Sequence, residues 1–359
     1  MKAAVCHEVG TELVIEEISL QPPTAGQVAV KIDACAICHS DISYIEGAWG
    51  GHLPAVYGHE AAGTISAVGS GVTEYAAGDS VIVTLIKSCG TCPTCSSGHQ
   101  VNCEQSTDRI KSSPISLADG TVAEHGLDTG AFAEMAVVDQ SQVVKIPDDI
   151  PKDVASLLAC GVITGLGAVV NTAGVRAGKS VVVIGAGGVG LNAIQGAVLV
   201  GASKIIALDL EPEKLEGALE FGATDVINAA DKDVARQVRK LTGGRGADFV
   251  FITVGAISVF ETATRLLAPR GEMIMVGMPP SGAKASYEPV ILSALSQSIK
   301  GSLMGDTVLK RDIPWLIEQY RQGRLKLDEL ITNRYSLDQI NEAIADTKAG
   351  KSRRNVIVF

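Results

Sequence analysis

The stretch Val181-Val-Val-Ile-Gly185-Ala-Gly187-Gly188-Val-Gly190 decides the expected fold. An apolar, strand-like run leads into a glycine-rich turn, and the turn opens an apolar helix. In this context Gly-x-Gly-x-x-Gly is typical of a dinucleotide-binding βαβ unit. Gly185 allows the tight turn, Gly187 lets the backbone approach the pyrophosphate, and Gly190 lets helix and strand pack closely. The positive end of the helix then faces the phosphates. The alternative is a glycine turn selected only for packing.

The next strand-like run ends at Asp209, which bears on the kind of dinucleotide. A carboxylate at this place suits the two hydroxyls of an adenosine ribose. The next residue is Leu210, so this position offers no arginine that could bind the 2′-phosphate of NADP. The sequence therefore favours NAD over NADP.

Outside this stretch, the chain has two parts with different sequence patterns. The first third reads as short strands separated by glycine and proline, which predicts a β-rich, barrel-like part. Further on, helix-length segments separate apolar runs, which predicts a parallel sheet covered on both faces. These runs are 180–184, 204–208, 225–228, 248–253 and 272–276. We therefore expect an α/β chain with a doubly wound parallel sheet and a second, β-rich domain.

Bulk composition narrows the class of protein. The chain has 359 residues, of which 46% are hydrophobic and 19% charged, and its formal net charge is −10. Without a basic run, a nucleic acid or an anionic membrane is not an expected partner. We find neither a signal-peptide pattern at the start nor an apolar stretch long enough to span a membrane. The expectation is a cytoplasmic protein with reduced thiols.

Four cysteines lie close together in the sequence: Cys89, Cys92, Cys95 and Cys103. Overlapping Cys-x-x-Cys pairs with one further thiol can surround a tetrahedral zinc ion. Such a site leaves no ligand position for a substrate, so the zinc would be structural. A disulfide cluster is the alternative, and the reducing compartment disfavours it.

Three more residues are candidates for a second, open zinc site. Cys38, His59 and Cys160 lie far apart in the sequence, so spacing alone does not join them. Two thiolates and one imidazole would leave the fourth tetrahedral position for water or substrate. Taken singly, each is better explained as a small buried residue or a core histidine.

The chain as a whole resembles the zinc-dependent medium-chain alcohol dehydrogenases. Gly58-His59-Glu60-Ala-Ala-Gly63 is similar to the zinc signature of that family, and the four-cysteine lobe and the glycine fingerprint match its spacing. The C-terminal segment 350–354 also fits. The resemblance implies a GroES-like catalytic domain over 1–162 and 303–359, with a zinc lobe at about 88–104. It implies a Rossmann NAD-binding domain over 163–302 and two zinc ions per subunit.

The resemblance also implies roles in catalysis. Cys38, His59 and Cys160 would bind the catalytic zinc, Glu60 would lie beside it, and Asp41 would orient the ring of His59. Zinc would act as a Lewis acid on the alcohol, and hydride would pass to the nicotinamide. Ser40 would take the alcohol proton. Many relatives have a histidine relay group where this chain has Ser43.

Further contacts follow from the same resemblance. For the cofactor, they are the glycine turn with Gly188, Asp209, Lys214 near the ribose, Thr164 and Val189 behind the nicotinamide ring, and His39 and Arg354 near the phosphates. Val276 is a further cofactor contact and also a candidate for the substrate pocket. An exposed polar side chain is the alternative for His39. Trp49 and Leu85 would line the substrate pocket, although Trp49 could equally be a packing aromatic.

We therefore expect hydride transfer between an alcohol and NAD, with a primary aliphatic or benzylic alcohol favoured. The alternatives are an S-(hydroxymethyl)glutathione (formaldehyde) dehydrogenase and a zinc-binding member without catalysis. A zinc-free quinone oxidoreductase would lack the four-cysteine lobe and Cys160. The resemblance also implies self-association, and because a long segment at 104–129 tends to accompany dimers in this family, it favours a homodimer over a tetramer.

Overall fold

The computed structural model describes all residues from 1 to 359, and the chain divides into two compact units. The first consists of Met1–Gly161, Val308–Arg321 and Leu327–Phe359, and the second of Val162–Thr307 and Gln322–Lys326. Compared with the expected domains, the return to the first unit comes at 308 rather than 303, and 322–326 belongs to the second unit.

The first unit contains two sheets. The smaller has the strand order β7-β2-β1-β4-β8. Its strands are β1 (Lys2–Cys6), β2 (Val14–Leu20), β4 (Ala55–Val56), β7 (Ile115–Leu117) and β8 (Glu124–His125). The larger has the order β10-β6-β5-β3-β18-β17, with β9 also paired to β3. Its strands are β3 (Gln27–Ala36), β5 (Glu60–Val68), β6 (Ser80–Val83), β9 (Met135–Asp139), β10 (Val143–Lys145), β17 (Ile331–Ser336) and β18 (Arg354–Val358).

Short helices connect these strands. They are α1 (His39–Ile45), α2 (Pro93–Ser96), η1 (Gln100–Asn102), η2 (Gly126–Asp128), η3 (Gln140–Gln142), α3 (Lys152–Leu157), α10 (Leu309–Arg321), η7 (Asp328–Leu330), η8 (Leu337–Gln339) and α11 (Ile340–Ala349). The alternation of apolar side chains along β3 places Val28, Val30 and Ile32 in one buried cluster, together with Tyr57 and Phe132. The prediction that the first third of the chain is rich in β-strands is therefore confirmed.

The second unit is built around a single parallel sheet of order β13-β12-β11-β14-β15-β16. Its strands are β11 (Ser180–Ile184), β12 (Lys204–Asp209), β13 (Asp225–Asn228), β14 (Ala247–Ile252), β15 (Leu267–Met275) and β16 (Ser298–Gly301). All five strands expected from apolar runs are present; their ends differ by one residue at most, except that β15 begins five residues earlier than expected. The sequence missed β16, which is short and mostly exposed.

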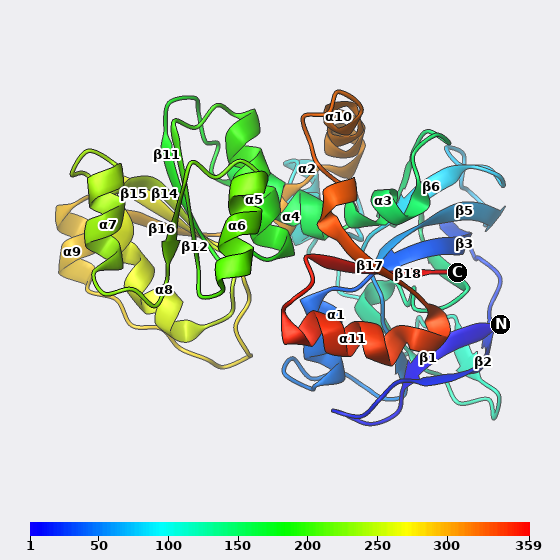
Figure 1. Ribbon diagram of the computed structural model, residues 1–359. Helices are drawn as coiled ribbons and strands as arrows, with labels where there is room; N and C mark the ends of the chain where they lie inside the picture. Colours follow the sequence, from blue (N-terminus) through cyan, green and yellow to red (C-terminus); the bar gives the residue numbers. More distant parts are fainter. The chain divides into compact units, whose positions relative to one another are not determined.

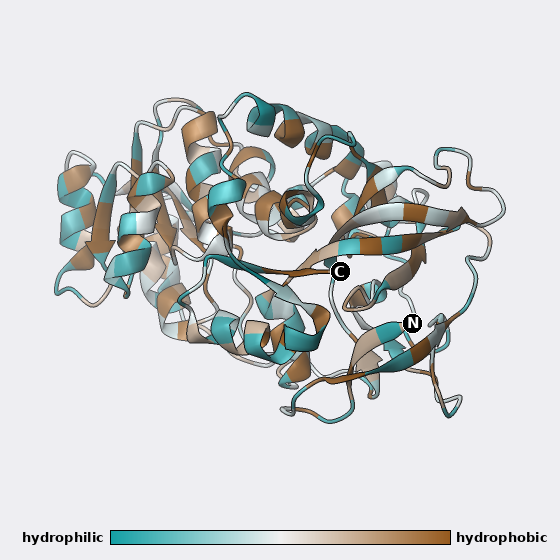
Figure 2. Ribbon diagram, turned by 45° about the vertical axis from the view of Figure 1, so that its right-hand side comes forward, coloured by the Kyte–Doolittle hydropathy of each residue, from teal (hydrophilic) through white to brown (hydrophobic).

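Helices cover both faces of this sheet, with α5 and α6 on one side and α7 and α8 on the other (Figure 1). The helical segments of the unit are α4 (Gly161–Gly167), η4 (Ala168–Thr172), α5 (Gly188–Leu199), α6 (Pro212–Glu220), α7 (Val234–Leu241), α8 (Ile257–Ala263), η5 (Thr264–Leu266), α9 (Pro289–Ala294) and η6 (Met304–Asp306). Hydrophobic and hydrophilic residues alternate along many helices, as expected where one face is buried (Figure 2). The doubly wound α/β prediction is confirmed.

Candidate active site and metal centres

Asp41 organises the first cluster of candidate metal ligands. Its carboxylate is buried and accepts hydrogen bonds from the backbone N–H groups of Cys38 at 3.2 Å and Gly58 at 3.0 Å. It also lies 2.9 Å from Nδ1 of His59. Because a carboxylate accepts, Nδ1 carries the proton and the lone pair of the imidazole is on Nε2. That Nε2 atom is buried and has no hydrogen-bond partner, as expected of an atom that binds a metal.

Three separate elements bring the ligands together. Cys38 caps α1, His59 directly precedes β5, and Cys160 lies in the turn between α3 and α4. The ligand atoms of these three residues and of Glu60 lie within 4.8 Å of one another, and the group is buried. The structure thus joins residues that the sequence could associate only through resemblance.

The pKa values of the two thiols in this cluster are shifted in opposite directions. A hydrogen bond from Cys160, with His59 nearby, holds the pKa of Cys38 well below its usual range, while the same bond and burial raise the pKa of Cys160. Burial opposes protonation of His59, but Asp41 and the Cys38 thiolate outweigh it and raise its pKa. A divalent cation replaces such protons. Two sulfur ligands and a free imidazole nitrogen fit zinc, with one tetrahedral position left open.

Glu60 and Arg354 form a buried pair beside these ligands. Nη2 of Arg354, at the start of β18, donates to Oε2 of Glu60, and both side chains are almost fully buried. Burial raises the pKa of Glu60 to about 7, although Arg354 opposes this shift. Oε1 of Glu60 has no hydrogen-bond partner. From the resemblance we expected Arg354 to contact a phosphate, not to pair with Glu60. No local sequence pattern indicates this pairing.

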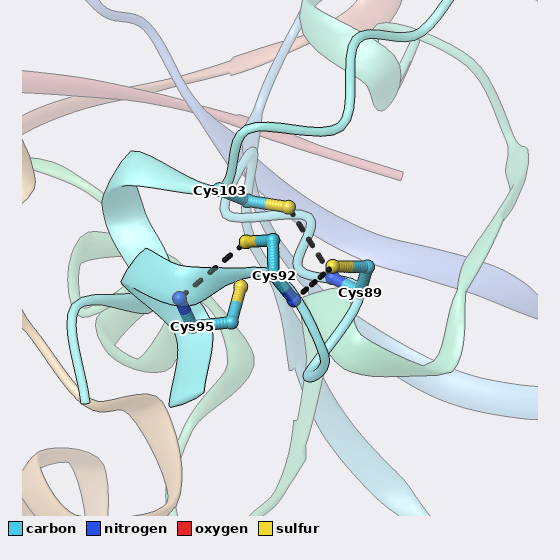
Figure 3. Close-up of side chains that lie close together, drawn as sticks. All are labelled: Cys89, Cys92, Cys95 and Cys103. Atoms are coloured by element: carbon cyan, nitrogen blue, oxygen red, sulfur yellow. Dashed lines mark hydrogen bonds between the residues drawn. The ribbon is translucent and has the colours of Figure 1, made fainter. Parts of the chain in front are cut away.

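The four cysteines of the lobe form the second cluster. Their sulfur atoms face a common centre and lie within 4.8 Å of one another (Figure 3). The backbone N–H groups of Cys92 and Glu104 donate to Sγ of Cys89 and Cys92, at 3.3 and 3.5 Å. Such bonds, led by the one from Glu104, lower the pKa of Cys92 to about 6. None of the eight cysteines forms a disulfide bond, which fits a four-thiolate metal site and not the disulfide alternative.

The glycine turn of the second unit meets the needs of a dinucleotide site. Gly185 has φ +98°, and a Cβ atom on Gly190 would lie 1.8 Å from the carbonyl oxygen of Gly185. Nothing lies within 4 Å of the Cβ position of Gly187. The packing of the protein therefore requires the outer two glycines, whereas Gly187 leaves open space at the start of α5, which suits an approaching phosphate.

Six further cofactor candidates belong to the second unit. Asp209, at the end of β12, accepts the N–H of Ala186 at 2.7 Å and that of Glu211 at 3.1 Å. This fixes the carboxylate beside the turn. Gly188 and Val189 open α5, Lys214 lies on α6, Thr164 on α4, and Val276 directly follows β15.

The remaining candidates belong to the first unit. His39 is exposed and Ser40 half-buried, and both lie in the first turn of α1, next to the ligand Cys38. Trp49 follows α1 and packs edge-on against Tyr44, with ring centroids 5.5 Å apart. Leu85 is half-buried beyond the end of β6.

Comparison with known proteins places this arrangement in a family. The chain matches the models "Alcohol dehydrogenase GroES-like domain" over residues 24–148 and "Zinc-binding dehydrogenase" over 188–321. It is 38% identical to the NDMA-dependent alcohol dehydrogenase of Amycolatopsis methanolica, covering 99% of this chain and 98% of that one. The chain belongs to the zinc-type medium-chain alcohol dehydrogenases. Its expected membership is confirmed, and it is an alcohol dehydrogenase-type oxidoreductase.

Other relatives show the range of this family. The S-(hydroxymethyl)glutathione dehydrogenase of Komagataella pastoris is 37% identical, with 100% of this chain and 97% of that one covered. The solved structure of benzyl alcohol dehydrogenase from Acinetobacter calcoaceticus has a TM-score of 0.94 and 32% identity, and the match covers 100% and 99% of the two chains. As for membranes, none of the helices in this dehydrogenase combines the length and apolarity needed to cross one.

Proposed function

We propose that this alcohol dehydrogenase oxidises primary aliphatic or benzylic alcohols to aldehydes, reversibly, with NAD as hydride acceptor and two zinc ions per subunit. The observation that carries the proposal is the buried group of Cys38, His59 and Cys160, with Nε2 of His59 unpartnered. The open glycine turn and Asp209 support NAD as the cofactor.

Zinc bound at this group would supply Lewis acidity, which lowers the pKa of an alcohol. The protein would do the rest through its own residues. Asp41 keeps His59 in the tautomer that presents Nε2. Ser40, two residues after Cys38, would accept the hydroxyl proton of the alcohol. Ser43 cannot serve as a base near neutral pH, so the proton would continue to solvent or to another group.

The acceptor and the substrate each have a competing assignment. One relative is NDMA-dependent by name, which favours NDMA as a second acceptor to be tested beside NAD. Another is an S-(hydroxymethyl)glutathione dehydrogenase. Trp49, where an acidic residue would suit a glutathione adduct, supports a simple alcohol instead. A zinc-binding member without catalysis is the remaining alternative.

The test is a set of turnover assays on the purified, zinc-loaded enzyme. NADH formation at 340 nm is followed with ethanol, longer primary alcohols, secondary alcohols, benzyl alcohol and S-(hydroxymethyl)glutathione, before and after chelation, and NDMA replaces NAD in a parallel series. Chelator-sensitive NADH formation with a simple alcohol supports the proposal. Turnover only with NDMA contradicts NAD as the exchanging acceptor, and turnover only with the glutathione adduct contradicts the substrate class. No turnover at all supports the non-catalytic alternative.

We also propose that the enzyme is a cytoplasmic homodimer. The strand β16 is the edge of the parallel sheet, and apolar side chains near it are exposed, with Val290 at 70% and Leu303 at 41%. An edge strand with exposed apolar neighbours favours pairing with a second copy. Light scattering coupled to size exclusion measures the mass: twice that of the chain fits the dimer, and four times that mass fits the tetramer.

A further inference from the structure

Arg109 stands at the centre of a polar network that neither the resemblance nor the proposed mechanism uses. It lies between the four-cysteine lobe and β7, and its side chain is only 30% exposed. Its Nε donates to Asp128 at 3.2 Å, and its Nη1 donates to the hydroxyl of Tyr44 at 3.4 Å. The guanidinium also lies 5.7 Å from the centre of the Tyr44 ring. Arg109 therefore joins the segment after the lobe to α1 through a hydrogen bond and a cation–π contact with Tyr44.

Glu124 connects the same arginine to the loop that follows α1. Its side chain is 3% exposed, and its Oε1 lies 3.7 Å from Nη1 of Arg109. Its Oε2 accepts the backbone N–H of His52 at 2.5 Å. A buried carboxylate with only these partners is costly unless both are kept. The loop and the arginine thus share one anchor.

Trp49 lies in the loop that this anchor holds, between α1 and His52. Glycines with positive φ flank it: Gly47 at +75°, Gly50 at +75° and Gly51 at +130°. Glycine gives a loop many accessible conformations. Its ring packs edge-on against Tyr44, and the ring of Tyr44 stacks on Tyr57 with centroids 5.8 Å apart.

Two of these aromatic residues lie on the segments that carry metal ligands. Tyr44 lies on α1, whose cap is Cys38, and Tyr57 lies two residues before His59. A shift of these rings would therefore move side chains on the same segments that carry the metal ligands.

We propose that Arg109 and Glu124 are positioning residues that hold Trp49 in place and thereby set the size of alcohol that the metal centre accepts. This inference rests on the proposed function for its substrate, but the positioning of Trp49 can be measured without any turnover. Arg109 and Glu124 touch neither the metal ligands nor the glycine turn.

The experiment uses the full-length enzyme with Trp315→Phe, which leaves Trp49 as the only tryptophan. Arg109→Gln and Glu124→Gln are compared with Lys111→Gln, a control on the same segment whose side chain is 86% exposed. We expect the first two variants to shift the emission of Trp49 to longer wavelength and to increase its quenching by acrylamide. The control variant should leave both unchanged. Tyr44→Phe keeps the ring and removes the hydroxyl, so it should shift the emission of Trp49 in the same direction but by less. It replaces a charge variant that does not fold.

Kinetics provide the second readout. In Arg109→Gln and Glu124→Gln the KM for benzyl alcohol should change by about tenfold, because a small change in the shape of a hydrophobic pocket has an effect of this size. The KM for ethanol and the kcat values for both alcohols should stay near wild type. Arg109→Lys keeps the charge near Asp128 but not the planar stacking on Tyr44, so it should restore only part of the fit.

The outcomes separate the two proposals. Unchanged Trp49 fluorescence in folded Arg109→Gln and Glu124→Gln overturns the positioning role, and so does an equal change of KM for both alcohols. If the wild type turns over no alcohol with NAD or NDMA, the proposed function fails, while the fluorescence result still decides whether Arg109 and Glu124 position Trp49.

Discussion

The two cysteine clusters of this enzyme differ in how the chain builds them. The lobe cluster comes from one short stretch, lies near the surface, and has backbone N–H groups as its hydrogen-bond donors. The buried cluster comes from three distant segments and is held by the carboxylate of Asp41. Four sulfur ligands close a tetrahedron, whereas two sulfur atoms and one imidazole leave a position open. Local, closed ligation suits a structural role, and distributed, open ligation suits catalysis.

Removing a ligand from the buried cluster should have the largest effect. In Cys160→Ser the open site loses a thiolate, so we expect the zinc content to fall by one ion per chain and kcat/KM to fall by about a thousandfold or more, because Lewis-acid stabilisation is worth several kcal/mol. Mass spectrometry of the metal and steady-state kinetics measure this. Cys35→Ala, a buried cysteine outside both clusters, is the matched control. Full activity in Cys160→Ser would refute the assignment.

Removing a ligand from the lobe should affect stability instead. Cys92→Ser should also lose one zinc ion, but its main consequence is a lower Tm, by about 2–4 °C for each kcal/mol of lost stability in a unit of this size. The kcat of the protein that remains folded should be close to wild type. Calorimetry and kinetics on the same sample check this. A loss of kcat at unchanged Tm would show that the two clusters do not divide their roles in this way.

The support of His59 should matter less than the ligands themselves. In Asp41→Asn an amide oxygen can still accept from Nδ1, but the negative charge is lost. We expect zinc affinity or activity to fall by about 10–100-fold, as is usual for such partners. Competition with a chromophoric chelator measures the affinity. Asp33→Asn, a half-buried carboxylate on β3 that is not in either cluster, is the control. Unchanged affinity would mean that packing alone orients the ring.

The same contrast explains what could be predicted from the sequence. The glycine turn and the lobe are contiguous patterns, so their chemistry follows from spacing. The parallel strands were found because they are buried on both faces and read as apolar runs, whereas the exposed β16 was missed. Cys38, His59 and Cys160 needed resemblance, since only the tertiary fold brings them within reach of one another.

Pairings between distant side chains lay beyond sequence reasoning. Arg354 and Glu60 meet because β18 joins the sheet next to β3, and β5 lies on the other side of β3. Arg109 lies in a loop with no recognisable motif, and nothing in its neighbourhood indicates that Tyr44 and Glu124 lie close to it. Such contacts depend on strand order, which residue spacing does not encode.

A comparison of two buried imidazoles gives the smallest expected effect. His59 has Asp41 as partner, whereas Nε2 of His125 is buried without one, and burial lowers the pKa of His125 from 6.5 to about 4. Because the folded-state pKa is depressed, the unfolded chain binds the extra proton first as the pH falls. Stability from this group is therefore complete above pH 6.5 and is lost progressively from there down to pH 4, by about 1.4 kcal/mol at pH 5.5.

Replacement of His125 by glutamine should remove this dependence, since an amide does not titrate. We expect the fall in unfolding free energy between pH 7.5 and 5.5, measured by urea titration, to be smaller in His125→Gln than in wild type by about 1.4 kcal/mol. The exposed His99 provides the control, and His99→Gln should retain the wild-type dependence. An equal fall in all three proteins would show that His125 is already hydrated in the native state. The pH sensitivity of a buried imidazole in this fold would then not follow from whether it has a carboxylate partner.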